Sequence, residues 1–249
     1  MELIRRLYGR FSERAKMTRV ECLSVGLGYT AVVTDDGGIG ISYSYFSNKH
    51  CCSMHGNYRD YESEPAIELL GELESQDPLH RSMALALVNA LNYGEAGSFP
   101  GDPKDNVLIE TFGIGRGTHV AMVGFFRPLV KQFEQLGAQV EILDDTHGLG
   151  DRGRFYEKLN KWAEVLILTA TSILNGTTED ILAAGAPGVK TVMIGPSTPM
   201  VADGFRHLPV NMLAGMVPLD KEGVLKAVRH GAGTPVIHRS SRKAYLILD

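Results

Sequence analysis

The stretch that decides the fold is Val165-Leu-Ile-Leu-Thr-Ala-Thr-Ser-Ile-Leu-Asn-Gly-Thr177, followed by Thr191-Val-Met-Ile-Gly-Pro-Ser-Thr-Pro-Met200. Each segment opens with a short apolar run and then changes to small, hydroxyl-bearing and glycine residues. An apolar run without polar alternation is typical of a strand covered on both faces, as in a parallel sheet flanked by helices. Such sheets bind ligands beyond the carboxyl ends of their strands, so these two loops are the first candidates for a functional site.

The chain around this stretch alternates between strand and helix patterns. This alternation predicts a doubly wound parallel α/β sheet, and right-handed crossovers limit how its strands are ordered. We expect the order 3-2-1-4-5, with residues 244–248 as a last strand at an edge. The expected strands are 119–123, 139–143, 165–168, 191–194 and 212–217, and the expected helices are 128–136, 154–162, 179–184 and 221–230.

The first part of the chain shows strands first and helices second, which is an α+β pattern. An opening amphipathic helix carries Leu3, Leu7, Tyr8 and Phe11 on one face, and a hairpin turns at residues 35–38. Buried helices follow around residues 67–73 and 83–91. The Gly- and Pro-rich segment 94–105 then marks a boundary. We predict a small α+β domain over residues 1–100 and a Rossmann-like domain over residues 101–249.

The composition is that of an ordinary globular protein, with 44% hydrophobic and 22% charged residues. A net charge of -4 provides no basic surface for nucleic acid or an anionic membrane. The sequence contains no apolar run of about 18 residues, and an odd number of cysteines, 3, fits a reducing compartment. We expect a cytoplasmic protein whose partner is a small-molecule or metal ligand, with neither nucleic acid nor membrane as partner. A homo-oligomer is left open.

Two features of the sequence, a glycine-rich motif and an acidic strand end, bear on nucleotide binding. Gly113-Ile-Gly-Arg-Gly117 follows an expected helix, 106–112, and precedes a strand, so we interpret it as a helix-ending turn and not as a dinucleotide fingerprint. The loop after the first strand of the sheet has a single glycine, Gly124. Asp144 ends the next strand, where nucleotide-binding sheets place a ribose-binding acid. The alternative for Asp144 is a solvated turn.

The hydroxyl-rich loops at the ends of the third and fourth strands are the expected ligand site. Thr177 and Asp180 have capping-box spacing, but capping explains one hydroxyl and the loop holds several. A glycine in the following loop allows a ligand to approach closely. The candidate residues of these loops are Thr169, Thr171, Asn175, Gly176, Thr177, Gly195, Pro196 and Ser197.

A different candidate is the segment His50-Cys-Cys-Ser-Met-His55, which packs five soft or borderline metal ligands into six residues. Thiolate and imidazole favour a soft or borderline transition metal such as zinc or copper(I). The spacing matches no standard zinc site, and buried inert cysteines are the alternative interpretation. We expect His50, Cys51, Cys52 and His55 to be the ligands if the segment holds a metal.

Taken together, 87–92, 163–177, 194–199 and 213–217 resemble a prokaryotic family labelled "putative heavy-metal chelation". The resemblance spans nearly the whole chain. It implies a domain similar to the enolase N-terminal fold, then a Rossmann-like domain, with the site between them. By resemblance, Asn89 and Asn92 would face this cleft from the first domain, opposite the loops after the third and fourth strands.

The expected function is heavy-metal chelation, or the binding or processing of a metal-chelating small molecule, in the cleft between the two domains. The alternative is a transferase or lyase that uses a nucleotide-like or S-adenosylmethionine-like ligand at the switch point of the sheet. A third interpretation is a non-catalytic scaffold with buried cysteines. Whether the protein is an enzyme stays open at this point.

Overall fold

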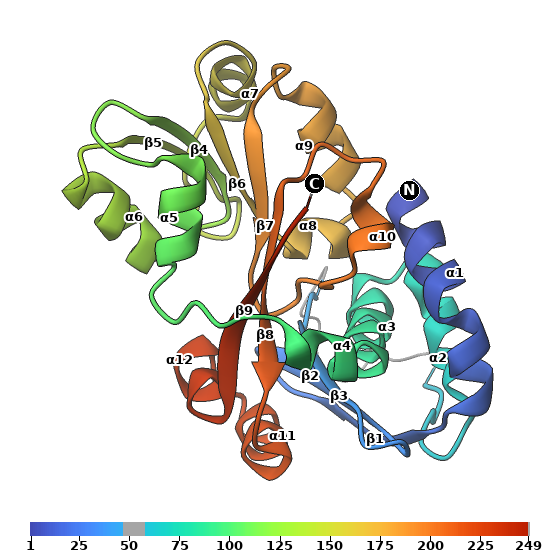
Figure 1. Cartoon of the computed structure of the whole chain (residues 1–249). Coiled ribbons are helices and arrows are strands. Elements are labelled where there is room, and N and C mark those ends of the chain that lie inside the picture. The colour runs from blue at the N-terminus through green and yellow to red at the C-terminus, as the bar shows by residue number, and fades with distance from the viewer. Residues whose placement is uncertain (47–57, 249) are drawn as a thin grey trace.

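The computed structural model describes residues 1–46 and 58–248. It contains a three-stranded antiparallel sheet near the N-terminus and a six-stranded, mostly parallel sheet after it (Figure 1). This confirms an α+β part followed by a doubly wound part. The elements before residue 100 are α1 (Glu2–Met17), β1 (Val20–Val25), β2 (Tyr29–Thr34), β3 (Ile39–Tyr43), α2 (Ala66–Leu70), η1 (Gly71–Glu74), α3 (Pro78–Leu91) and α4 (Tyr93–Ser98).

Helix α1 is amphipathic, as its sequence predicts. Leu3, Leu7 and Phe11 are buried, whereas Tyr8 is 37% exposed and does not belong to the apolar face. The apolar face packs on α2 and α3 of the same part of the chain, and also on α10 of the second part. The first helix therefore joins the two parts.

The small sheet is covered by helices from both parts of the chain. Helix α3 crosses β3 at close range, because a Cβ on Gly40 would lie 2.2 Å from the carbonyl oxygen of Ala86. The opposite face carries Ala31, Val33 and Ile41, which pack against the apolar side of α11. Residues after 220 thus complete the hydrophobic core on one face of a sheet whose three strands all lie before residue 44.

The large sheet has the order β5-β4-β6-β7-β8-β9, and its first five strands are parallel. Strand β9 lies at the edge, as predicted, and it pairs antiparallel with β8. The elements after residue 100 are α5 (Asn106–Phe112), β4 (His119–Val123), α6 (Arg127–Gln135), β5 (Gln139–Leu143), α7 (Arg152–Lys161), β6 (Val165–Thr169), α8 (Thr171–Leu174), α9 (Thr178–Ala184), β7 (Lys190–Ile194), α10 (Ala202–Phe205), β8 (Met212–Pro218), α11 (Lys221–Arg229), α12 (Thr234–Ile237), η2 (His238–Ser240) and β9 (Ser241–Ile247).

The expected strand order 3-2-1-4-5 is wrong, because the third strand of this sheet, β6, lies beside β4 and not beside β5. The two helices that flank β5 explain the difference. The apolar side of α6, with Leu129 and Phe133, packs on one face of the sheet, whereas that of α7, with Phe155 and Leu159, packs on the other. A right-handed crossover on the opposite face carries the chain back past β4. The switch point therefore lies between β4 and β6.

The segment between the two parts is attached along its length. It contains α4, and the Tyr245 amide donates to the Pro100 carbonyl, while Gly101 bridges to Ala244 of β9. The boundary at residues 100 and 101 stays a prediction. Helix α5 ends at Gly113 with a φ of +65°, which confirms the helix-ending turn. Within the described residues, no helix has both the length and the apolar character to cross a membrane.

Candidate functional site

A cavity of about 860 Å³ opens at the carboxyl ends of β4, β6 and β7, on the face of the sheet that α5 and α6 cover. Strand β8 forms its floor and β9 one of its walls, and β2 and β3 of the small sheet contribute Tyr29 and Tyr43. The segment before α5 and residues 234–238 complete it. Most of the wall is apolar or aromatic: Leu108, Phe125, Phe126, Leu129, Ile194, Met212, Ala214, Met216 and Tyr245.

Five of the predicted ligand-site residues line this cavity. Thr169 and Thr171 follow β6, and their hydroxyl oxygens lie 3.0 Å apart. Gly195, Pro196 and Ser197 follow β7. Gly195 has a φ of +125°, a conformation that side chains rarely adopt, and nothing lies within 4 Å of where a Cβ would be. The hydroxyl-rich loops of two neighbouring strands therefore meet at one cavity.

Gly124 lies behind the cavity wall, at the switch point. Its φ is +91°, and an added Cβ would lie 2.9 Å from the Cβ of Thr169. A side chain at this position would displace Thr169. Gly124 thus lets the loop after β4 approach the loop after β6.

Asp144 holds two loops together and does not line the cavity. Its carboxylate accepts hydrogen bonds from the amides of Phe125, at 2.7 Å, and His147, at 2.9 Å. The same carboxylate pairs with Nδ1 of His147, and the Asp144 side chain is 11% exposed. Asp144 is not a solvated turn residue, because each of its oxygens accepts a backbone amide, and its role as a ribose acceptor stays a prediction. It positions Phe125 and His147, which do line the cavity.

Asn89 and Asn92 support the cavity wall from behind. The Asn89 amide donates to the carbonyls of Ile41, at 2.9 Å, and Ser197, at 3.4 Å. The buried Asn92 donates to the Met200 carbonyl, at 2.9 Å. Both residues contact the loop after β7, which was expected opposite them, but neither lines the cavity, and their role in ligand binding stays a prediction. Their side chains are used to fasten the loop after β7 to helix α3.

Asn175, Gly176 and Thr177 lie beyond α8, away from the cavity. The Thr177 hydroxyl donates to Asn175 Oδ1 and makes no cap to α9, so the expected capping box is absent. The preceding residue, Leu174, accepts a hydrogen bond from Nε of Arg81 in α3. Helix α8 begins at Thr171, and its single turn carries the chain from Thr169 to these three residues.

The cavity residues that were missed in the sequence include Asp105, His238 and Lys243, which lie near one another. The Lys243 ammonium pairs with the Asp105 carboxylate at 2.5 Å, across 138 residues of chain. Burial raises the pKa of Asp105, and the neighbouring Lys243 opposes this. Burial also lowers the pKa of His238, and the charge of Lys243 lowers it further. No local pattern marks these residues, since the pairing depends on how β9 joins the sheet.

A metal site is not formed by the described part of the chain: residues 1–46 and 58–248 hold no group of three or more His, Cys, Asp or Glu side chains that could bind an ion. The predicted ligands His50, Cys51, Cys52 and His55 lie outside the described residues. Their metal role stays a prediction. Cys22, the remaining cysteine, is a free thiol on β1.

Two family models match the chain, and both carry the description "Putative heavy-metal chelation". One covers residues 8–92, and the other covers residues 107–247. The chain belongs to this family. The comparison with curated proteins finds no match.

Two solved structures are similar over their whole length. The first, of a protein of unknown function from Pyrococcus horikoshii, has a TM-score of 0.82 at 19% identity and covers 99% of this chain and 100% of its own. The second, from Desulfitobacterium hafniense DCB-2, has a TM-score of 0.75 at 16% identity and covers 98% of each chain. Both belong to the family that matches residues 107–247. At these identities the likeness shows the fold.

Proposed function

We propose that this protein binds a metal-chelating small molecule in the cavity at the switch point, and that the chelator supplies the ligands of the metal. The size and wall of the cavity are the observation that carries this proposal. A cavity of about 860 Å³ lies near the upper end of the range for sites that enclose drug-sized ligands, roughly 300–1,000 Å³, and far exceeds the space of one ion.

The wall also fits an organic ligand. Aromatic and aliphatic side chains surround most of the space, while a few hydroxyl and charged groups, such as Thr169 and Lys243, interrupt them. This combination is typical of small-molecule sites, in which apolar surface contributes affinity and few polar groups fix orientation. The metal in this proposal is supported by the description of the family, which names heavy-metal chelation.

Isothermal titration with zinc–2,2′-bipyridine, free bipyridine and free zinc tests the proposal. Ala214 lies on the floor of the cavity, so a phenyl ring in Ala214→Phe would occupy part of the space. We expect this variant to bind the complex at least about tenfold more weakly, which corresponds to about 1.4 kcal/mol. The matched control is Ala183→Phe on the exposed side of α9, for which we expect no change.

Three results would count against the proposal: no organic chelator binds, binding is equal in both phenylalanine variants, or zinc alone accounts for the whole signal. If Ala214→Phe melts early, Thr171→Leu blocks the same space from another wall. Native mass spectrometry of protein purified without a histidine tag would show a retained ligand directly.

A second candidate is a transferase or lyase with a nucleotide-like or S-adenosylmethionine-like ligand. Phe125 and Phe126 favour it, because aromatic rings at a switch point offer a surface for a base. The bonded carboxylate of Asp144 weighs against it. A thermal-shift screen with nucleotides and S-adenosylmethionine decides, since a ligand at ~100 times its Kd stabilises by roughly 2.7 kcal/mol. No shift would remove this candidate.

A further inference from the structure

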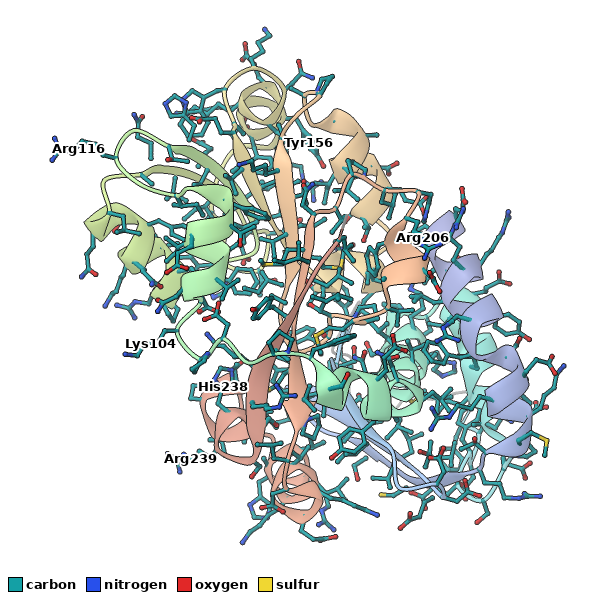
Figure 2. The ribbon with its side chains drawn as sticks, viewed as in Figure 1. Lys104, Arg116, Tyr156, Arg206, His238 and Arg239 are labelled. Atoms are coloured by element: carbon teal, nitrogen blue, oxygen red, sulfur yellow. The ribbon has the colours of Figure 1, made fainter. Side chains whose placement is uncertain are left out.

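The cavity has one charged wall, which lies on strand β9. Lys243, Ala244 and Tyr245 all line the cavity, and Ala244 also belongs to the main core. Side chains alternate along a strand, so Lys243 and Tyr245 share one face of β9. Lys243 lies opposite Met216 of β8, so the ammonium stands at the margin of an apolar floor. Figure 2 shows His238 beside β9, near the segment that leads into α5.

Two carboxylates lie on this wall, and both are occupied. Asp102 accepts hydrogen bonds from the amides of Asn106 and Val107, at 2.9 Å each, and so caps the start of α5. Asp105 makes no such cap and pairs with Lys243. Its backbone has a φ of +57°, which only a few non-glycine residues adopt. The bent segment before α5 thus brings a carboxylate to the ammonium.

The cationic groups keep unused donors. An ammonium has three N–H donors, and Asp105 is the one hydrogen-bond acceptor that the described residues provide for Lys243. The Lys243 side chain is 30% exposed and that of Asp105 13%. Arg127, at the start of α6, also lines the cavity and forms no ion pair with a described carboxylate. The wall therefore offers free donors and no free carboxylate, which is the complement of an anion.

An ion pair is also a costly way to brace a cavity wall. Removing two charges from water costs free energy that their attraction repays only when the remaining donors are bonded too. A ligand oxyanion would supply the missing acceptors for Lys243. An apolar ligand would leave them unsatisfied.

We propose that the chelator bound in this cavity carries an ionised carboxylate, or an equivalent oxyanion, and that the Lys243 ammonium is its anchor. This inference rests on the function proposed above. In the absence of a ligand, Asp105 is the counter-ion of Lys243. It holds the ammonium at the cavity wall and at the same time repels an incoming anion. Substitutions of the two partners should consequently change the affinity for an anionic ligand in opposite directions.

The test compares the zinc complexes of 2,2′-bipyridine and of 2,2′-bipyridine-4,4′-dicarboxylate by titration calorimetry on the full chain. We expect the dicarboxylate to bind the wild type roughly 10- to 100-fold more tightly, the range for hydrogen bonds to a charged group. Lys243→Gln should abolish this preference, and Asp105→Asn should increase it several-fold. The bipyridine complex carries the 2+ charge of zinc and no carboxylate, so Lys243→Gln should not weaken its binding, whereas Asp105→Asn should. Damage to the fold would lower both affinities in both variants.

Lys104 provides the matched control. It lies in the same segment as Asp105 and points away from the sheet in Figure 2, so Lys104→Gln removes an equal charge outside the cavity. We expect the wild-type preference in this variant. If Lys243→Gln melts early, Lys243→Arg keeps the charge and should keep the preference.

The outcomes separate the two proposals. If both complexes bind equally well, or if Lys243→Gln keeps the preference, the carboxylate anchor is wrong and the chelator-binding function stands. Parallel losses in Lys243→Gln and Asp105→Asn for both complexes would show that the ion pair only braces the wall. If neither complex binds, the chelator-binding function itself fails.

Discussion

Asp144 and its neighbour Asp145 offer a test of how the switch point is held together. The Asp144 carboxylate accepts two backbone amides, those of Phe125 and His147, and its side chain is 11% exposed. Asp145 is 66% exposed, and among the described residues its carboxylate pairs with Arg152 alone. Adjacent aspartates thus have the same chemistry and very different surroundings. We expect Asp144→Ala to be strongly destabilising and Asp145→Ala to be nearly neutral.

The magnitude follows from the bonds that are lost. A hydrogen bond to a charged group contributes about 1.5–3 kcal/mol. Because water reaches these loops after the substitution, we take the lower end for each of the two amides, which makes about 3 kcal/mol for Asp144→Ala. For a chain of this size that lowers the Tm by roughly 6–12 °C. An exposed ion pair such as that of Asp145 contributes about 0–1 kcal/mol.

Thermal and urea unfolding of both variants measure the difference. Asp144→Asn should fall between Asp144→Ala and the wild type, because an amide keeps one acceptor and presents its NH₂ group to the second backbone amide. If the two alanine variants unfold within about 1 kcal/mol of each other, the amide bonds of Asp144 do not hold the loops in solution. The account of Phe125 and His147 as positioned by Asp144 would then be wrong.

Three further predictions concern the same region and the cysteine segment. Gly124→Ala should lower the free energy of unfolding by about 1–3 kcal/mol more than Gly37→Ala does. Both glycines have a positive φ, but only at Gly124 would the added Cβ meet a neighbour, the Cβ of Thr169 at 2.9 Å. Equal losses of stability would show that the two loops move apart freely. His238 should titrate below 6.5 by NMR, because burial and the charge of Lys243 lower its pKa, and Lys243→Gln should raise the midpoint. A folded-state pKa below the unfolded value means that the stabilising contribution of His238 is present above about 6.5 and is lost as the pH falls, so a midpoint above 6.5 would contradict its burial. Titration of zinc or copper(I) under reducing conditions should show weaker binding in Cys51→Ser/Cys52→Ser, and unchanged affinity would leave both cysteines without a metal role.

The sequence by itself determined most of the helices and strands, and it identified which loops at strand ends belong to the candidate site. Apolar runs such as 165–168 predicted strands covered on both faces, because a strand inside a doubly wound sheet has no polar face. The loops with Thr169 and Ser197 were found because an abrupt change from apolar to small hydroxyl residues at a strand end is a local signal. These loops do meet at the cavity.

The tertiary structure alone decided the strand order and the charged wall. Right-handed crossovers allow both 3-2-1-4-5 and the observed order, and the choice depends on which face of the sheet receives the apolar side of α7. Asn89 and Asn92 turned out to fasten a loop, because a side-chain amide bonds whichever carbonyl the packing brings near. Lys243 and Asp105 lie 138 residues apart and meet only when β9 closes the edge of the sheet. Contacts of this kind arise from packing between distant segments, and no local pattern of residues encodes them.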